Sequence, residues 1–195
     1  EYPIVNVPEE WSGNWGYSVS DKNYELESQW SANPHRDLWI VSVKDGKSRM
    51  LLKDVYIQSV SASPEGKYLT WFNLTDRNWY SYDVKEDKIR NISSDIKTSL
   101  TDELHDTPEM APGYGSCGWM TGDTAFFIKD RYDVWQLDPK AAKPALNLTD
   151  GIGRAEKKSF DMVDLSEMLL PPGTPGVKND PVKPGSTIYF SVFDE

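Results

Sequence analysis

A short segment that begins with Asp or Asn and continues with aromatic and β-branched residues recurs three times along the chain. The copies span residues 37–43, 78–84 and 133–138, so their starts lie 41 (78 − 37) and 55 (133 − 78) residues apart. Aromatic and β-branched residues are enriched in strands, and a recurring unit of this size is typical of repeat architectures. The repeat therefore restricts the chain to folds that stack one strand-rich unit on the next.

Each copy is followed by a polar turn and a second short strand, which is the pattern of a β-hairpin. The turn after the first copy contains Asp45-Gly46, and Gly supplies the positive φ that a tight reversal needs. The other two turns are Lys85-Glu-Asp-Lys88 and Pro139-Lys-Ala-Ala142. The strands after the three turns are expected at residues 49–52, 89–92 and 145–148.

Two further strands precede the hairpin in the middle unit. We expect them at residues 55–60 and 68–72, joined by the turn Ser63-Pro-Glu-Gly-Lys67. The third unit repeats this order with residues 114–119 and 124–128. Four short strands in about 40 residues is the spacing of one blade of a β-propeller.

The sequence accordingly predicts an all-β fold, a partial β-propeller built as an arc of about three to four four-stranded antiparallel blades in one domain, 1–195. A sandwich of two sheets is the competing interpretation, because it also has short strands at regular spacing. Within a polar loop insert, Ser99-Leu-Thr-Asp102 could cap a short helix. The units are expected at residues 11–53, 54–93, 113–150 and, incomplete, 151–195, with the loop insert at 94–112.

The run Tyr68–Phe72 lacks a clean alternation of apolar and polar residues. Strands that are covered on both faces read this way, so we expect blades in face-to-face contact. Large aromatic residues tend to be buried, and those of the repeats are expected to fill the space between blades rather than form a ligand platform. Strand-forming residues also occur at 24–30, before the first repeat.

Two segments resemble a known family. Ser63-Pro-Glu-Gly-Lys-Tyr68 is similar to the turn that recurs in TolB-like and dipeptidyl-peptidase-type propellers. Residues 130–139, Asp-Arg-Tyr-Asp-Val-Trp-Gln-Leu-Asp-Pro, followed by residues 146–154, resemble the propeller of bacterial prolyl-oligopeptidase-family serine peptidases. The resemblance covers most of residues 37–160.

That family joins a propeller to an α/β-hydrolase domain that holds a Ser, Asp and His triad. The resemblance implies that this chain is the non-catalytic propeller portion, which gates the access of peptide substrates and docks the hydrolase domain. The parent protein would then be a serine peptidase whose catalytic domain lies outside this sequence. The resemblance also favours a periplasmic or secreted location.

No residue of the chain is predicted to have a catalytic, cofactor-binding or metal-binding role. A nucleophile elbow needs Gly two residues before and two residues after the Ser, but the residue two before Ser116 is Tyr. Cys117 is the one cysteine, and it is expected to be a small buried residue. The two histidines, His35 and His105, are expected in polar loops rather than beside a nucleophile.

Several polar motifs have both a functional and a structural interpretation. Sequons begin at Asn73, Asn91 and Asn147, and although they could accept glycans in a secreted protein, local turn bonding is favoured. The carboxylates of Asp21-Lys-Asn23 and Asp130–Asp133 are spaced to touch a hard cation. Neither segment matches a calcium loop, so solvated turns are expected.

The charge balance excludes one class of partner. The chain has 21 Lys and Arg against 31 Asp and Glu, a net charge of −10, and no basic cluster. Nucleic-acid affinity rests mainly on cationic side chains that neutralise phosphates, so nucleic acid is not expected as a partner. The apolar runs fall far short of the ~20 residues that a membrane helix needs, so no membrane span is expected.

Two alternatives to the peptidase interpretation stay open. Eight Trp residues and the absent triad would suit a stand-alone propeller-like module that binds a glycan or a protein partner, and the acidic balance would suit a scaffold for a basic protein. The last strand, at 187–193, is followed closely by Glu195, so we expect a piece of a larger propeller. Exposed blade edges can pair with another chain, which makes an edge-to-edge homodimer a further expectation.

Overall fold

The computed structural model describes residues 4–7, 14–163 and 180–194. Within these residues the protein is all-β: four antiparallel sheets follow one another along the chain, and helical structure is limited to short segments. Four sheets form where a sandwich would have two. No helix in the described residues is long and apolar enough to cross a membrane.

Each sheet is built from strands that are neighbours in sequence. The first sheet has the order β1 (Trp15–Ser20), β2 (Arg36–Ser42), β3 (Ser48–Val55). The second sheet has the order β4 (Ile57–Ala62), β5 (Tyr68–Asn73), β6 (Asn78–Asp83), β7 (Lys88–Asn91). The third sheet has the order β8 (Ser116–Trp119), β9 (Phe126–Lys129), β10 (Val134–Leu137), β11 (Leu146–Asn147). The fourth sheet contains β12 (Lys158–Val163) and β13 (Tyr189–Asp194), and the helical segments are η1 (Lys22–Tyr24), η2 (Glu27–Gln29), η3 (Thr121–Asp123) and α1 (Ile152–Glu156).

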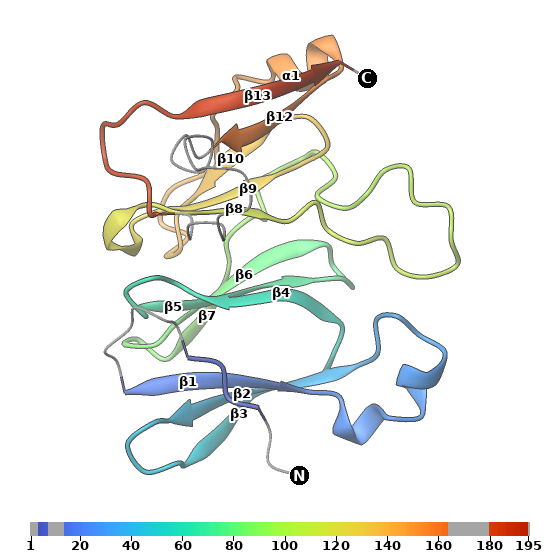
Figure 1. The fold of residues 1–195 in the computed structure, drawn as a ribbon, viewed down its shortest axis with the longest axis vertical. Helices are drawn as coiled ribbons and strands as arrows, with labels where there is room; N and C mark the ends of the chain where they lie inside the picture. The colour runs from blue at the N-terminus through green and yellow to red at the C-terminus, as the bar shows by residue number, and fades with distance from the viewer. Residues whose placement is uncertain (1–3, 8–13, 164–179, 195) are drawn as a thin grey trace, which may run out of the picture.

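The sheets are stacked face to face, with their strands running across the view of Figure 1. β5 lies in the middle of the stack and is buried on both faces. Because side chains alternate along a strand, its two sets of side chains pack against different sheets. Tyr68 and Phe72 belong to a core shared with Trp119 of the third sheet. Leu69 and Trp71 belong to a second core, shared with the first sheet. The expectation that the repeat aromatics fill the space between sheets is confirmed for the second and third repeats, whereas Trp39 of the first repeat belongs to neither core.

The three recurring segments form β2, β6 and β10, and the strands predicted after the turns form β3, β7 and β11. The strands predicted before the second and third hairpins also form, as β4, β5, β8 and β9. β1, β12 and α1 were not predicted. β1 reads Trp-Gly-Tyr-Ser-Val-Ser, and its Gly and Ser residues obscure the strand signal of the repeats.

Residues 24–30 do not form the expected strand. η1 and η2 occupy this segment because its polar side chains bind the end of the first sheet. The Tyr24 hydroxyl donates to Asp37 (2.9 Å), and the Glu27 carboxylate accepts the backbone N–H of His35 (3.2 Å). These bonds hold the segment in a folded loop, where a strand would place alternate side chains on opposite faces.

The loop insert 94–112 contains no helix, so the helix expected at Ser99 is wrong. The Ser99 hydroxyl accepts the backbone N–H of Thr101 (3.2 Å). Thr101 then forms an isolated antiparallel bridge with Gly113. The side chain that would cap a helix therefore bends the chain locally instead. The rest of the insert is a loop, as predicted, and it projects on the right in Figure 1.

The turn between β4 and β5 fastens three sheets together. From the first sheet, the Trp15 indole N–H donates to the carbonyl oxygen of Gly66 (2.9 Å). From the third sheet, Asp123 accepts the Ser63 hydroxyl (2.6 Å) and the backbone N–H of Lys67 (3.2 Å). Gly66 has a φ of +70°, a conformation that favours glycine. The turn thus depends on both neighbouring sheets for its hydrogen bonds.

Candidate functional site

A cleft of about 1200 Å³ lies at one end of the stack, where the turns of the second and third sheets gather. The β4–β5 turn and η3, which border it, lie on the left in Figure 1, opposite the loop insert. The first sheet also contributes to its wall. Residues from the three sheets that line the cleft include Trp15, Lys67, Tyr68, Lys85, Leu137 and Lys143.

Two carboxylates at the cleft are occupied by donors of the protein itself. Asp138 accepts the backbone N–H groups of Lys140 (2.9 Å), Ala142 (3.0 Å) and Lys143 (3.1 Å). Asp123 is held by the β4–β5 turn. Backbone donors stabilise a carboxylate strongly, so these two side chains shape the turns and leave little capacity to bind a cationic ligand.

Two of the lysines at the cleft are paired with neighbouring carboxylates. The Lys67 ammonium donates to the carbonyl oxygen of Gly122 (2.8 Å) and pairs with Glu65 (2.9 Å). The Lys140 ammonium pairs with Glu86 (2.8 Å). Hydrogen bonds to these glutamates raise the pKa of both lysines, so both carry a positive charge at neutral pH.

The other two lysines have no ion-pair partner within the described residues. Lys85 and Lys143 are both exposed at the rim. They stand beside an apolar wall to which Tyr68, Pro144 and Leu146 contribute. The cleft therefore combines unpaired ammonium groups with apolar surface, although the chain as a whole has a net charge of −10. Such a site suits a ligand that carries carboxylates and apolar side chains.

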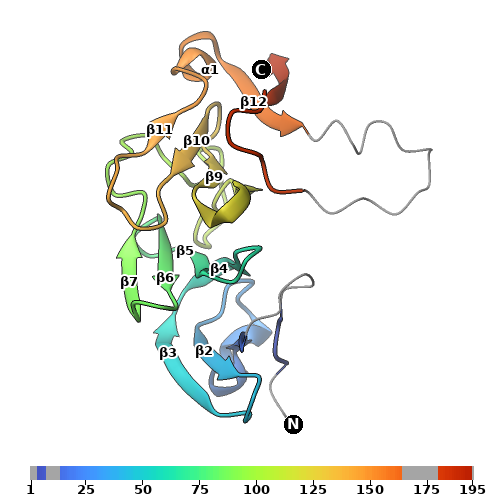
Figure 2. The ribbon, with the colours of Figure 1, turned by 90° about the vertical axis from the view of Figure 1, so that its left-hand side faces the viewer.

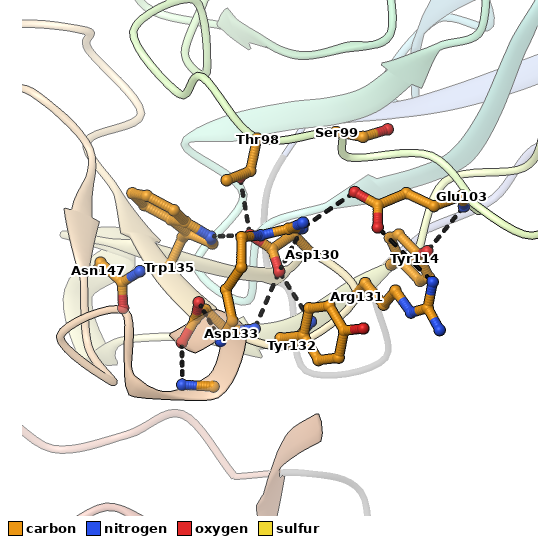
Figure 3. Close-up of polar contacts among 12 residues, drawn as sticks. Thr98, Ser99, Glu103, Tyr114, Asp130, Arg131, Tyr132, Asp133, Trp135 and Asn147 are labelled. Atoms are coloured by element: carbon orange, nitrogen blue, oxygen red, sulfur yellow. Dashed lines mark hydrogen bonds and ion pairs between the residues drawn. The ribbon is translucent and has the colours of Figure 1, made fainter. Parts of the chain in front are cut away.

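The opposite end of the stack holds a buried aspartate at the β9–β10 turn (Figure 3). Asp130 is 2% exposed and accepts the backbone N–H groups of Tyr132 (2.8 Å) and Asp133 (2.9 Å). The Trp135 indole (3.0 Å) and the hydroxyl of Thr98 in the loop insert (2.8 Å) donate to the same carboxylate. The prediction of a solvated turn is wrong here, because donors of the protein replace the water that a buried carboxylate would lose.

A second buried aspartate joins β10 to the segment after β11. Asp133 is 1% exposed and accepts the Thr149 hydroxyl (2.6 Å) and the backbone N–H groups of Gly153 (3.0 Å) and Arg154 (3.2 Å). The Arg154 guanidinium also pairs with Glu103 of the loop insert (3.0 Å). The segment that carries the family resemblance is thus held together by two structural carboxylates. Within the described residues, no group of three or more His, Cys, Asp or Glu side chains is arranged to hold a metal ion.

The first sheet has a counterpart of this carboxylate at the start of β2. Asp37 is buried and accepts the backbone N–H of Asp54 (3.0 Å), the Asn23 amide (2.8 Å) and the Tyr24 hydroxyl (2.9 Å). Burial alone raises the pKa of Asp37, but these donors outweigh it and the pKa is lowered. Asp21 is exposed, as predicted, whereas Asn23 serves as a hydrogen-bond donor to the buried carboxylate.

The sequon asparagines form local turns, which confirms the structural interpretation of these motifs. In each sequon the side-chain oxygen accepts the backbone N–H two residues on, at 2.9–3.1 Å: Asn73 from Thr75, Asn91 from Ser93 and Asn147 from Thr149. The hydroxyls of the last two sequons are also bonded to the first residue of the repeat strand, Ser93 to Asn78 (2.9 Å) and Thr149 to Asp133 (2.6 Å). In the second and third units the sequon hydroxyl therefore joins the end of the unit to the start of its recurring strand.

The residues considered as nucleophiles or bases have other partners. Ser116 lies on β8, which pairs with β9, and not at a strand-to-helix turn. Cys117 is partly buried, and burial raises the pKa of its thiol to about 11, so the reactive thiolate is scarce at neutral pH. His35 contacts the Glu27 carboxylate (2.7 Å), and His105 contacts a backbone carbonyl oxygen (3.1 Å).

The tryptophans do not form one exposed platform in the described part of the chain. Four of them, Trp15, Trp71, Trp79 and Trp119, are buried between sheets. Trp30 is 70% exposed at the end of η2. A glycan could stack on Trp30, whereas the four buried tryptophans are used for packing.

The chain matches no protein-family model and no curated protein. The cleft was not predicted from the sequence. The signal that could have located it is the lysine in each turn after β4, β6 and β10, at Lys67, Lys85 and Lys140. These turns share one end of a meander, because successive antiparallel strands reverse direction.

Proposed function

We propose that this chain is the non-catalytic β-propeller portion of a prolyl-oligopeptidase-like serine peptidase, which gates peptide access and docks an α/β-hydrolase domain. One observation carries the proposal. The second sheet is a four-stranded antiparallel meander that is covered on both faces. The third sheet, also a four-stranded meander, covers one face, and the first sheet covers the other. Stacked meanders of this kind are the building blocks of a propeller arc.

The equivalence between the sheets extends to single residues, which supports the proposal. The second residue of the recurring strand is Leu38, Trp79 or Val134, and all three are buried. The first residue is Asp37, Asn78 or Asp133, and each bonds groups outside its own strand. Repeating units that keep both a packing position and a polar position are what a blade architecture requires.

The cleft is the part of this arc that we assign to peptide contact. Its apolar wall, with the exposed Pro144 and Leu146, can accept an apolar side chain, and Lys85 and Lys143 attract carboxylates. It opens at an end of the strands, where the turns of several units converge. A domain docked there would close over a peptide held between it and the propeller.

Titration calorimetry with unstructured peptides of acidic, neutral and basic composition tests the assignment. Acidic peptides are expected to bind most tightly, and Lys143→Glu should weaken their binding about tenfold, which is ~1.4 kcal/mol. Lys97→Glu is the matched control, since it makes the same charge change on the exposed loop insert at the other end of the stack. An equal loss in both variants would mean a general charge effect and would remove the cleft from the proposal.

The catalytic part of the proposal is tested with chromogenic peptides. The pure chain is expected not to hydrolyse them. Hydrolysis that disappears in Ser116→Ala would overturn the proposal. The alternative is a stand-alone binding module, and it predicts a change of tryptophan fluorescence on titration with a glycan panel that Trp30→Ala abolishes.

A further inference from the structure

The second sheet has an open edge along β4. In the order of this sheet, β4 is the first strand, and within the described residues it pairs only with β5. The first and third sheets cover the two faces of the second sheet, so this edge is not one of the ends of the stack. Figure 2 shows β4 on the concave side of the curved stack and β7, the opposite edge, on the convex side. An unpaired strand edge presents backbone groups that another extended segment can bind.

The backbone of Ala62 points toward this open edge. Successive residues of an antiparallel strand direct their N–H and C=O groups alternately toward and away from the partner strand. The N–H of Ser63 donates to the carbonyl oxygen of Tyr68 (2.8 Å), so Ser63 faces β5 and Ala62, one residue earlier, faces away from it. Val60 faces the same way as Ala62, and its carbonyl oxygen accepts the Tyr17 hydroxyl (3.0 Å). Ala62 therefore keeps one donor and one acceptor for a further strand.

The other end of β4 is less suited to a further strand. The pairing of β4 with β5 shifts register between Gln58 and Ser61, and Ser59 has a φ of +52°. A bulge of this kind disrupts the ladder and bends the strand, and proteins use it to protect exposed edges. The accessible part of the edge is therefore the end of β4 at Ala62.

The corresponding edges of the two neighbouring sheets already hold extended segments. Asn6 forms an isolated antiparallel bridge with Tyr17 of β1, in which the two residues exchange both backbone hydrogen bonds (2.8 and 3.1 Å). Gly16 makes room for this segment, because a Cβ there would lie 2.9 Å from the carbonyl oxygen of Asn6. At the end of β8, Val182 forms a parallel bridge with Met120. Strand addition at this edge of a sheet therefore occurs on both sides of β4.

A cavity of about 400 Å³ lies beside Ala62 and is bordered by residues from both neighbouring sheets. On the side of the first sheet it is lined by Val7, which is 45% exposed. On the side of the third sheet it is lined by Ser116 and Gly118, and a Cβ at Gly118 would meet no atom within 4 Å. Because side chains alternate along a strand, a strand beside β4 would direct one set toward Val7 and the other toward the open space at Gly118. The first wall suits apolar side chains, and the second suits small polar ones.

We propose that the open edge of β4 binds an extended peptide as an additional strand, with one peptide residue exchanging two backbone hydrogen bonds with Ala62 as Asn6 does with Tyr17. In this mode of recognition the main chain supplies the affinity and alternate side chains supply the specificity. The ligand is an unfolded, uncharged segment with an apolar residue at every second position. The site goes beyond the proposed function, because it is separate from the lysines of the cleft and needs no hydrolase domain.

Amide hydrogen exchange at Ala62, followed by NMR, tests the site directly. The probe is a short peptide in which Val and Ser alternate, with an acetylated N-terminus and an amidated C-terminus, so that no charge directs it to the cleft. The Ala62 amide is expected to exchange rapidly in the free protein and to become protected when the peptide is added. The Ser63 amide, which is bonded to Tyr68, should be protected in both states. Protection of Ala62 without peptide would show that the edge is already paired and would overturn the proposal.

Ala62→Pro removes the donor at the open edge and keeps the pairing of β4 with β5. Proline is tolerated on an edge strand where its nitrogen faces away from the partner strand. In titration calorimetry the variant should bind the Val-Ser peptide about tenfold more weakly than the wild type. Ile89→Pro is the matched control on β7: Ile92 donates to Trp79 of β6, so Ile89, three residues earlier, faces away from β6. An equal loss of binding in both variants would overturn the proposal.

Methylated peptides test for recognition of the backbone without any change to the protein, and they carry the test if Ala62→Pro does not fold. Methyl groups on the Val nitrogens and methyl groups on the Ser nitrogens remove the donors on opposite sides of an extended peptide. One of the two methylated peptides should therefore lose its affinity for the wild-type chain, and the other should bind like the parent peptide. Equal affinities of the two methylated peptides would overturn the proposal.

The same titrations separate this site from the cleft. Lys143→Glu should weaken the binding of acidic peptides, as described above, and leave the binding of the uncharged Val-Ser peptide unchanged. Binding of the Val-Ser peptide that depends on Lys143 and not on Ala62 would overturn the edge site and retain the cleft. Protection of Ala62 by the Val-Ser peptide, without binding of acidic peptides, would do the reverse. A dimer of the purified chain that Ala62→Pro dissociates would mean that the edge pairs with a second copy, and it would also overturn the proposal.

Discussion

The two ends of the stack use aspartates with similar hydrogen bonds in different surroundings. At the end with the loop insert, Asp133 accepts three donors and is buried. At the end with the cleft, Asp138 also accepts three donors but is partly exposed. Water can replace a lost partner only where it has access. The comparison of Asp133 with Asp138 teaches that burial, and not the number of bonds, decides how much stability is lost when such a carboxylate is removed.

Asp133→Ala is expected to have the largest effect of the substitutions that test this comparison. Three donors, two of them buried, lose their acceptor, and we expect a loss of about 2–4 kcal/mol in the free energy of unfolding. Asp138→Ala removes the same number of bonds in reach of water, and it should cost less than about 1 kcal/mol. Urea denaturation of the two variants measures the difference. Equal losses would show that burial is not the deciding factor.

Thr149→Val sharpens the comparison within the buried end. The Thr149 hydroxyl donates to Asp133 (2.6 Å) and lies 3.4 Å from the backbone nitrogen of Val134, which donates to it. A valine of similar shape removes both bonds but keeps the carboxylate, so the expected loss is about 1–2 kcal/mol. The double variant with Asp133→Ala should lose less than the sum of the single variants, because the two side chains bind one another. An additive result would contradict this coupling.

The dependence of stability on pH tests the same kind of carboxylate in the first sheet. The pKa of Asp37 is lowered in the folded protein, so its ionised form stabilises the fold above the ordinary pKa of about 3.9. This contribution is lost as the pH falls through the lowered value. The melting temperature of the wild type should therefore drop more steeply below about pH 4 than that of Asp37→Asn. Parallel curves would mean that Asp37 does not contribute.

Lys143→Glu should have the smallest effect on stability. The ammonium has no ion-pair partner in the described residues, and exposed substitutions of this kind change the free energy of unfolding by less than about 0.5 kcal/mol. The same variant is expected to weaken the binding of acidic peptides. A large loss of stability would instead give Lys143 a structural role, and the end with the cleft would then resemble the end with the loop insert.

Much of the fold could be predicted from the repeat. The recurring segments and their turns located the central strands because aromatic and β-branched residues mark strands and Gly, Asp and Pro mark reversals. β1 escaped this reasoning because its Gly16, Ser18 and Ser20 are poor strand formers, and its pairing with β2 becomes evident only in the folded structure. The segment 24–30 was predicted wrongly, since its strand-forming residues bind polar groups of the neighbouring sheet.

The polar site residues were harder to predict than the strands. The turn role of the sequons was predicted, because Asn side chains bond nearby backbone groups. The burial of Asp130 could not be foreseen, because one of its donors, Thr98, lies 32 residues earlier in the chain. The same holds for the cleft, whose walls come from three sheets and whose residues are adjacent only after folding.

The long-range bonds of the β4–β5 turn affect how the protein unfolds. Its bond from Trp15 spans 51 residues and its bond to Asp123 spans 60. A single unit excised from the middle of the chain would lose both, together with a core on each face. Amide exchange in β5 should therefore require the separation of whole sheets, and deletions that remove one unit should be tolerated less well than those that shorten the loop insert.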